Sequence, residues 1–292
     1  MTDQQKRGVL FAILAAAFYA LNSPISKLLL DRVSPTMMAA FLYLGAGISM
    51  AALCLIGNRH GFAASEQKLT RKELPYTIGM VVLDIAAPIA LMIGISKTSA
   101  ANASLLNNFE IVATSLIAML VFREKISRRL WLGIALVTLS SVILSVQDMS
   151  SFSFSAGSIF VLLACVCWGL ENNCTRMLSK KNPVQIVVIK GIFSGLGSLV
   201  IAWCVGEHLP DVTGMLLALA LGCVAYGLSI VCYIYAQREL GAAKTSAYYA
   251  VAPFIGVALS LLIFAELPSA GFVIALLIMI AGTCVVTVAD RE

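Results

Sequence analysis

Long, uncharged apolar runs are the feature of this chain that most limits its fold. Runs of about 20 residues, the length that a helix needs to cross the hydrocarbon core of a bilayer, recur along nearly the whole sequence. Hydrophobic residues make up 60% of the 292 residues and charged residues 12%, against roughly 45–50% and 25% in soluble proteins. A water-soluble fold of this size cannot bury so much apolar surface. The chain is therefore predicted to be an integral membrane protein.

We predict an all-α integral membrane fold with ten transmembrane helices. Charges, Pro or Gly separate the apolar runs, and almost nothing is left over for a domain outside the membrane. The longest connection, Asn58 to Glu73, is too short and too charged to form a core of its own. The predicted spans are Gly8–Leu30, Pro35–Gly57, Leu74–Ser96, Ser99–Phe122, Leu130–Val146, Ala156–Leu178, Pro183–Val205, Thr213–Tyr235, Thr245–Phe264 and Ser269–Val288.

The basic residues predict the direction of these spans. Sixteen Lys and Arg residues fall in the segments on one side of the membrane, only Lys27, Arg32 and Lys97 fall on the other, and Lys190 lies within a span. Cytoplasmic loops carry such an excess of basic residues. We therefore expect a multi-pass protein of the cell membrane, the inner membrane of a bacterium, with both termini in the cytoplasm. Because the net charge of +5 is sorted by side, it does not indicate nucleic-acid binding.

The two halves of the chain resemble each other at a spacing of about 145 residues. Gly8–Lys27 aligns without a gap with Gly157–Arg176, and Ala100–Ser104 aligns with Ala242–Ser246. An odd number of spans in each repeat places the second repeat upside down relative to the first. The sequence therefore predicts two inverted five-helix repeats, residues 1–149 and 150–292, in one membrane domain. Such repeats can open a central site first to one side of the membrane and then to the other.

Two motifs and the duplicated five-span unit carry a family resemblance that covers the whole chain. Phe-Tyr-Ala-Leu-Asn-Ser-Pro-Ile-Ser-Lys (Phe18–Lys27) and Trp-Gly-Leu-Glu-Asn-Asn-Cys-Thr-Arg (Trp168–Arg176) close the first span of each half, and Phe-x-Glu ends the fourth and ninth spans. The sequence resembles the drug/metabolite transporter superfamily, specifically its ten-helix EamA-type exporters. It departs from the family pattern at Tyr19-Ala20, where Trp-Gly is usual. The resemblance implies a central cavity, alternating access, and export of small metabolites, amino acids or drugs.

Four ionisable residues, Asp84, Glu110, Glu171 and Lys190, lie deep within predicted spans. A charge at this depth costs a few kcal/mol unless it is paired, protonated or in contact with water. Glu171 and Lys190 lie at matching depths on consecutive antiparallel helices, so we expect them to form an ion pair. This pair either holds the helices in register or binds substrate, with Lys190 on a carboxylate or phosphate and Glu171 on an ammonium or a proton.

Glu110 is the strongest candidate for a functional acid. Asn107 precedes it by three residues and Thr114 follows it by four, which makes one polar helical face at mid-membrane. Its counterpart in the second repeat is Ala252, so the acid is present in one half only. Glu110 either carries a proton or meets a cation, or it is protonated and simply bonded to a neighbouring helix. Asp84 has fewer polar neighbours on its own face.

Aromatic residues form the second part of the predicted site. Trp168 precedes Glu171 and Asn172, and Tyr19 precedes Asn22, by three or four residues, so each places a ring and a polar group on one face. Other tyrosines within spans either pack in the core or line a pocket that can bind an organic ammonium or an apolar side chain. The predicted substrate-binding residues are Tyr19, Asn22, Tyr43, Asp84, Asn107, Glu110, Trp168, Glu171, Asn172, Lys190, Tyr226 and Tyr249.

No catalytic set is present in the sequence, so we do not expect an enzyme. Only His60 and His208 occur, both in loops, and neither belongs to a nucleophile pair or a metal-ligand motif. The eight cysteines all lie in apolar runs, where they act as small packing residues. We therefore expect no cofactor and no metal, and a monomer is sufficient.

The charges of the four interior residues suggest the class of solute. If all are ionised they sum to minus two, which favours zwitterions or cations over di-anions. The first expectation is a carrier for an amino acid or a derivative, with a carboxylate on Lys190 and an ammonium on Glu110 or Glu171. Organic cations or drugs come second, nucleotide sugars and sugar phosphates last, and a channel or membrane scaffold is the alternative class. Export rests on the resemblance alone, and proton coupling stays open.

Overall fold

The computed structural model describes residues 3–57, 69–122, 127–148, 153–178, 181–240, 245, 248–265 and 267–289. Their regular secondary structure is helical, as predicted, apart from a short hairpin in which β1 (Val146–Asp148) pairs antiparallel with β2 (Ser153–Phe154). Most of the predicted connection between the second and third spans, and His60, Glu124 and Glu266, lie outside the described residues.

The helices follow the predicted spans closely at their ends. The first half contains α1 (Asp3–Ala20), α2 (Asn22–Leu29), α3 (Pro35–Gly57), the 3-10 turn η2 (Arg71–Glu73), α4 (Leu74–Lys97), α5 (Ala100–Leu106), α6 (Phe109–Phe122) and α7 (Arg128–Ser145). The second half contains α8 (Ala156–Leu178), α9 (Pro183–Cys204), α10 (Val212–Leu221), the π-helical segment η3 (Gly222–Leu228), α11 (Ser229–Leu240), α13 (Ala252–Phe264) and α14 (Ala270–Ala289).

Seven helical stretches in the described part of the chain are long and apolar enough to cross a membrane. They are Gln4–Leu29, Pro35–Leu55, Arg71–Lys97, Arg128–Ser145, Ala156–Thr175, Pro183–Cys204 and Val212–Ala236. The other three predicted spans hold shorter helices: the interrupted pair α5 and α6, and the apolar helices Ala252–Phe264 and Ala270–Val285.

Some predicted spans are not continuous α-helices. The helix over Gly8–Leu30 is interrupted at Leu21, and the one over Ser99–Phe122 is interrupted at Asn107 and Asn108. Pro24 has no N–H, so the carbonyl of Ala20 loses its helical partner. At the second break the N–H of Asn108 bonds to the carbonyl of Leu105, three residues earlier, in place of the carbonyl four residues earlier. In the eighth predicted span the π-helical segment η3 interrupts the α-helix. Such irregular backbone within a membrane belongs where protein or water satisfies it.

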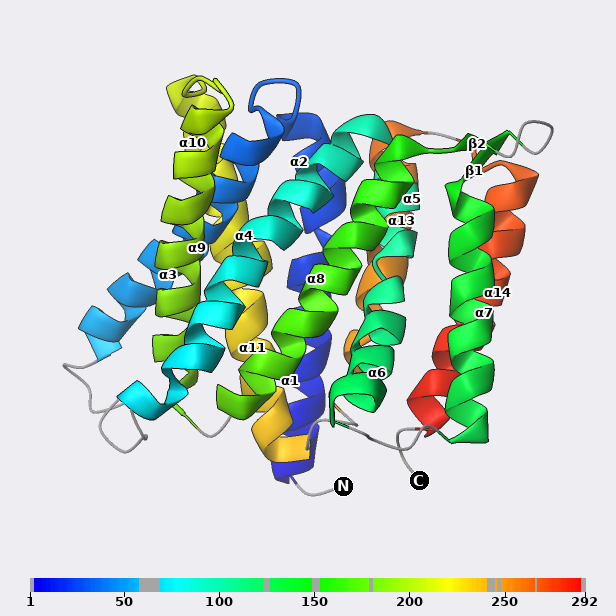
Figure 1. Ribbon diagram of the computed structural model, residues 1–292, viewed down its shortest axis with the longest axis horizontal. Coiled ribbons are helices and arrows are strands. Elements are labelled where there is room, and N and C mark those ends of the chain that lie inside the picture. The colour runs from blue at the N-terminus through cyan, green and yellow to red at the C-terminus, as the bar shows by residue number, and fades with distance from the viewer. Residues whose placement is uncertain are drawn as a thin grey trace.

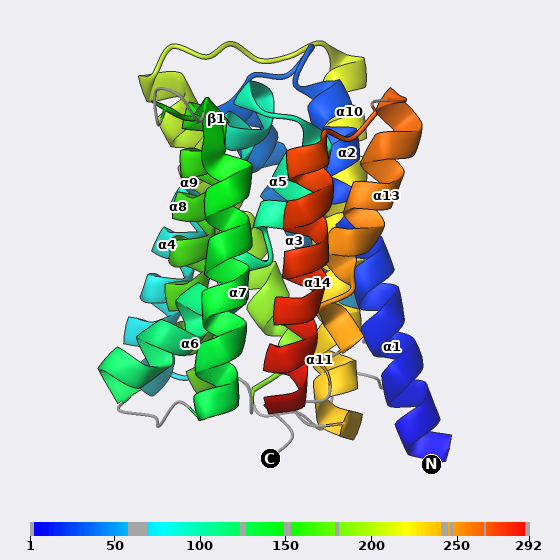
Figure 2. The same ribbon diagram turned by 90° about the vertical axis from the view of Figure 1, so that its right-hand side faces the viewer.

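Helices at corresponding positions of the two halves make corresponding contacts. α4 packs along α8 as α1 packs along α11, and α6 packs on α8 as α13 packs on α1. α3 packs along α9, its own counterpart, and α7 along α14. Figures 1 and 2 show α7 and α14 as a pair at one side of the bundle. Both figures also place the start of α1 and the end of α14 at the same end of the molecule.

Glycines allow α3 to lie directly against its neighbours. A Cβ atom on Gly45 would lie 2.1 Å from the carbonyl oxygen of Leu219, and one on Gly222 would lie 2.1 Å from that of Leu42. On the other side of α3, a Cβ on Gly191 would lie 2.4 Å from the nitrogen of Gly47. These are the small-residue contacts that let membrane helices approach closely.

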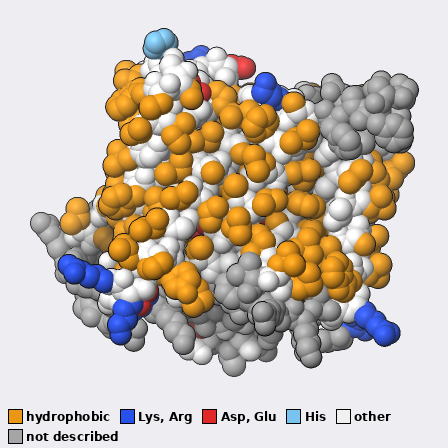
Figure 3. Space-filling model, viewed as in Figure 1, with side chains coloured by type: hydrophobic (Ala, Val, Ile, Leu, Met, Phe, Trp, Pro, Cys, Tyr) orange, Lys and Arg blue, Asp and Glu red, His pale blue; other side chains and the backbone are white. Residues whose placement is uncertain are grey.

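The outer surface is apolar over the middle of the bundle. Large side chains at mid-helix positions, such as Leu139, Phe193 and Leu277, are 50%, 58% and 62% exposed. Figure 3 shows the apolar side chains spread across the middle of one face, with Lys and Arg near its two ends. Hydrophobic side chains exposed over such an area are suited to contact with lipid.

Candidate functional site

Three of the four predicted interior charges form one buried cluster between α4, α8 and α9. The Nζ atom of Lys190 lies 3.0 Å from Oδ2 of Asp84 and 3.1 Å from Oε1 of Glu171. The three residues are 7%, 0% and 2% exposed, respectively. The predicted ion pair between Glu171 and Lys190 is thus confirmed. The contact of Asp84 with this pair was not predicted, because the partners of Asp84 lie on other helices and not on the same face of α4.

Hydroxyl groups from two further positions complete this cluster. The hydroxyl of Tyr43, on α3, donates a 2.8 Å hydrogen bond to Oδ1 of Asp84, and Thr175 donates to Oε1 of Glu171. Thr175 was overlooked, although its position four residues after Glu171 on one helix face was a usable signal. Two carboxylates share one ammonium here, so the cluster carries an excess negative charge when all three groups are ionised. Such a charge in a buried site favours a proton or a cationic group as partner.

Glu110 lies in the first turn of α6, directly after the break at Asn107 and Asn108. Its Oε1 atom accepts a 2.7 Å hydrogen bond from Nδ2 of Asn172 on α8, which also lies 3.4 Å from Oγ1 of Thr114. Glu110 and Thr114 therefore share one face, as predicted, and Asn172 connects that face to the helix that carries Glu171. The bond to a neighbouring helix, one of the two predicted alternatives, is present and occupies Oε1.

A group of tyrosines adjoins the charged cluster. The ring centroid of Tyr226 lies 6.0 Å from that of Tyr19 and 5.1 Å from that of Tyr43, and the Tyr19 centroid lies 5.9 Å from that of Tyr249. Tyr233, not predicted from the sequence, extends the group at 4.9 Å from Tyr249. Because Tyr43 contacts both Tyr226 and Asp84, it connects the aromatic group to the acids.

Asn22 is hydrogen-bonded to the tyrosine group, whereas Trp168 packs in the hydrophobic core. Nδ2 of Asn22 donates a 3.2 Å hydrogen bond to the hydroxyl of Tyr226, and Ser26 donates to Oδ1 of Asn22. Trp168, at 6% exposed, is part of the main hydrophobic core. The structure therefore brings most of the predicted residues together around two adjoining groups, one charged and one aromatic.

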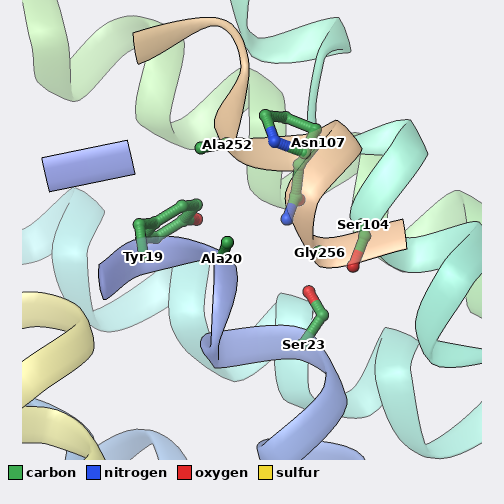
Figure 4. Close-up of a pocket in the computed structure, with 8 residues that line it drawn as sticks. Tyr19, Ala20, Ser23, Ser104, Asn107, Ala252 and Gly256 are labelled. Carbon is green, nitrogen blue, oxygen red and sulfur yellow. The ribbon is translucent and has the colours of Figure 1, made fainter. Parts of the chain in front are cut away.

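A small pocket lies where the interrupted helices meet, and Figure 4 shows its lining side chains. It has room for roughly one water molecule. Its walls come from α1, α2, α5, the α5–α6 break and α13: Tyr19, Ala20, Ser23, Ser104, Asn107, Ala252, Pro253 and Gly256. A solute of amino-acid size does not fit this pocket as it stands, so binding there requires the helices to move apart.

Among the described residues, no group of three or more His, Cys, Asp or Glu side chains is placed to hold a metal ion. The chemistry of this region therefore consists of carboxylates, one ammonium, neutral amides and hydroxyls, and aromatic faces. These groups are suited to reversible binding of a small solute.

Comparison with known proteins identifies a transporter family and two related transporters, and comparison with solved structures identifies the fold. The model of the EamA-like transporter family matches the chain twice, over residues 6–146 and 155–288. An uncharacterized transporter of Methanothermobacter thermautotrophicus is 27% identical over 278 residues, which cover 89% of this chain and 80% of that protein. The uncharacterized transporter YyaM of Bacillus subtilis is 18% identical over 245 residues, covering 81% and 79%. One crystal structure, 16% identical, has the same fold with a TM-score of 0.69 and coverage of 97% of each chain.

Proposed function

Because this chain belongs to the EamA-like transporter family, and is therefore a multi-pass membrane transporter, we propose that it carries a small zwitterionic metabolite, an amino acid or a derivative. Transport proceeds by alternating access around the charged and aromatic groups at the centre of the bundle, and its direction is export across the cytoplasmic membrane. The observation that carries the choice of solute is the buried Asp84–Lys190–Glu171 cluster beside the tyrosines.

The proposed architecture has ten membrane spans in two inverted repeats, residues 1–149 and 150–292. Two observations support it: the family model matches each half separately, and helices at corresponding positions make corresponding contacts. The bias of sixteen basic residues to one side supports cytoplasmic termini in the inner membrane. A single chain supplies every residue of the site, so a monomer is sufficient.

The proposed solute follows from the kinds of chemical group that the site contains. Lys190 provides one positive charge for a carboxylate, and the acids Glu110 and Glu171 provide partners for an ammonium group. The adjoining tyrosine group offers aromatic faces for an apolar side chain of the solute or for its ammonium group. A zwitterion with an apolar part satisfies all of these groups, whereas a phosphate ester would have only one buried cation to meet it.

Organic cations are the second candidate, because acids outnumber bases in the site. Lys190 pairs with Asp84 and Glu171, and the third acid, Glu110, is bonded to the amide of Asn172. An amine without a carboxylate would leave the Asp84–Lys190 pair intact and bind between Glu110 and the tyrosines. The two candidates differ in whether the Lys190 ammonium contacts the solute.

Thermal unfolding of the purified protein with a panel of amino acids and amines tests the proposal. A solute that binds the folded state raises the melting temperature, and we expect the largest shifts with zwitterions. Glu110→Gln keeps an oxygen that can accept from Asn172 but removes the charge, and should weaken binding by about 10-fold or more. Glu239→Gln, on the exposed part of α11, is the matched control.

Flux measurements in proteoliposomes separate a carrier from a channel. A carrier gives saturable uptake that unlabelled solute on the opposite side accelerates. If a ligand binds the Glu110→Gln variant as tightly as it binds wild type, Glu110 is not part of the binding site. Flux that never saturates would contradict alternating access.

A further inference from the structure

We infer that the pocket between the interrupted helices is a binding site for one small monovalent cation, with sodium as the first choice. No residue of the charged cluster lines this pocket, and the inference does not depend on which solute the protein carries. It rests on the groups that face the pocket, on their lack of hydrogen-bond partners, and on the charge nearby.

Two of the residues that line this pocket carry buried oxygen atoms without hydrogen-bond partners. Oγ of Ser104 and Oδ1 of Asn107 are buried and have no hydrogen-bond partner, and the two residues are 2% and 6% exposed. Figure 4 shows these two side chains and that of Ser23 directed toward the same space. A buried polar atom without a partner costs roughly 1–3 kcal/mol, so an occupant that satisfies several at once is strongly favoured.

The backbone adds a further oxygen to the pocket wall. Pro24 has no N–H to offer the carbonyl of Ala20, four residues before it. That carbonyl borders the pocket beside Gly256, since a Cβ atom built on Gly256 would lie 3.3 Å from the Ala20 oxygen and 2.9 Å from Oγ of Ser104. The N–H groups of Asn107 and Asn108 at the break are bonded to the carbonyls of Ala103 and Leu105. The interruption at Pro24 therefore places a carbonyl oxygen, an acceptor, at the pocket wall.

Neutral oxygens in a pocket of this size indicate the kind of occupant. Carbonyl, amide and hydroxyl oxygens are hard ligands, and interrupted membrane helices use them to hold monovalent ions. Calcium and magnesium bind with carboxylate ligands, and no carboxylate lines the pocket. Room for roughly one water molecule fits a sodium ion and excludes an organic cation.

The charge balance of the interior favours a cation over an ordered water molecule. Glu110 follows Asn107 by three residues across the break, and its carboxylate accepts a hydrogen bond from the amide of Asn172. A cation held by Asn107 and Ser104 would offset this charge, which a water molecule would not.

Binding of radioactive sodium to the purified protein tests the inference without any transport assay. Wild type should bind 22Na+ saturably, unlabelled NaCl should displace it, and choline chloride at equal ionic strength should not. Sodium at about 100 times its Kd should raise the melting temperature by about 5 °C relative to choline. Ser104→Ala should weaken sodium binding by about 10-fold or more, and Gly256→Ala should abolish it because the new methyl group fills the space.

Ser198→Ala is the matched control, because Ser198 on α9 is also fully buried with an unpartnered hydroxyl but does not line the pocket. It should bind sodium as wild type does. Wild type without saturable 22Na+ binding, or Ser104→Ala with unchanged sodium affinity, would overturn the inference and assign the pocket to water. Sodium binding in a protein that transports none of the tested solutes would instead leave this inference standing and reject the proposed function.

Discussion

The ammonium nitrogen of Lys190 lies 3.0 Å from a carboxylate oxygen of Asp84, although the two residues belong to opposite halves of the chain. At this distance the two side chains form an ion pair. Lys190 also meets Glu171, on a third helix. One side chain therefore holds α4, α8 and α9 together at the centre of the proposed transport path, and this arrangement leads to the first three predictions.

Lys190→Met should destabilise the protein by about 3–5 kcal/mol, because it leaves Asp84 and Glu171 buried without their counter-charge. Thermal unfolding of the purified protein measures the loss. Lys97→Met, at an exposed position, is the control and should change stability by no more than about 0.5 kcal/mol. A Lys190→Met protein as stable as wild type would show that the ion pairs contribute nothing to the fold.

Adding Asp84→Asn to Lys190→Met should recover part of the lost stability, since it removes one of the two uncompensated charges. We expect a coupling energy of about 0.5–3 kcal/mol between the two changes, measured as the departure of the double variant from the sum of the single ones. Additive effects would contradict a direct interaction.

Transport by this double variant also separates the two roles of Lys190. If the ammonium contacts the solute, flux per folded molecule stays at least about 10-fold below wild type even when stability is recovered. Flux restored together with stability would assign Lys190 a purely structural role.

Gly45→Ala should destabilise the bundle by about 1–3 kcal/mol or more, because the new methyl group would lie 2.1 Å from the carbonyl oxygen of Leu219 and force α3 away from α10. Gly271→Ala is the control: its nearest atom would be 3.9 Å away, and alanine favours the helix there. Melting temperatures of the two variants provide the comparison. Equal stability would mean that α3 and α10 do not pack as closely as the structure has them.

Single cysteines at Lys97 and Arg129, in a protein whose native cysteines are replaced, test the membrane topology. The proposed topology places Lys97 outside the cell and Arg129 in the cytoplasm. In sealed right-side-out vesicles, a membrane-impermeant maleimide should label Lys97→Cys directly and Arg129→Cys only after permeabilisation. Labelling of both from the same side would contradict the proposed order of spans.

The sequence predicted the helices well where local chemistry alone governs them. Apolar stretches such as Pro35–Gly57 and Ala156–Leu178 agree with α3 and α8 to the residue. A helix in a membrane satisfies its backbone within one segment, so hydropathy and length are enough to locate it. The interruptions at Leu21 and at Asn107–Asn108 were missed, because the apolar character continues across them while the hydrogen bonding does not.

The candidate site was predicted in its residues but only partly in its contacts. Glu171 and Lys190 could be paired from the sequence because they lie at equal depth on consecutive antiparallel helices. The contact of Tyr43 with Asp84, and that of Tyr19 with Tyr226, join segments whose relative rotation the sequence does not encode locally.

By itself, then, the sequence determined that this protein lies in a membrane, where its helices run, and which charges and rings they carry to mid-depth. These properties depend on the solvent preference of each segment and on bonding within it. Only the tertiary structure decided that Asp84 shares Lys190 with Glu171, that the tyrosines gather beside them, and that unpartnered oxygens of Ser104 and Asn107 face one small pocket. Such contacts depend on how helices rotate and pack against one another, which is settled by shape and close approach between residues far apart in the chain.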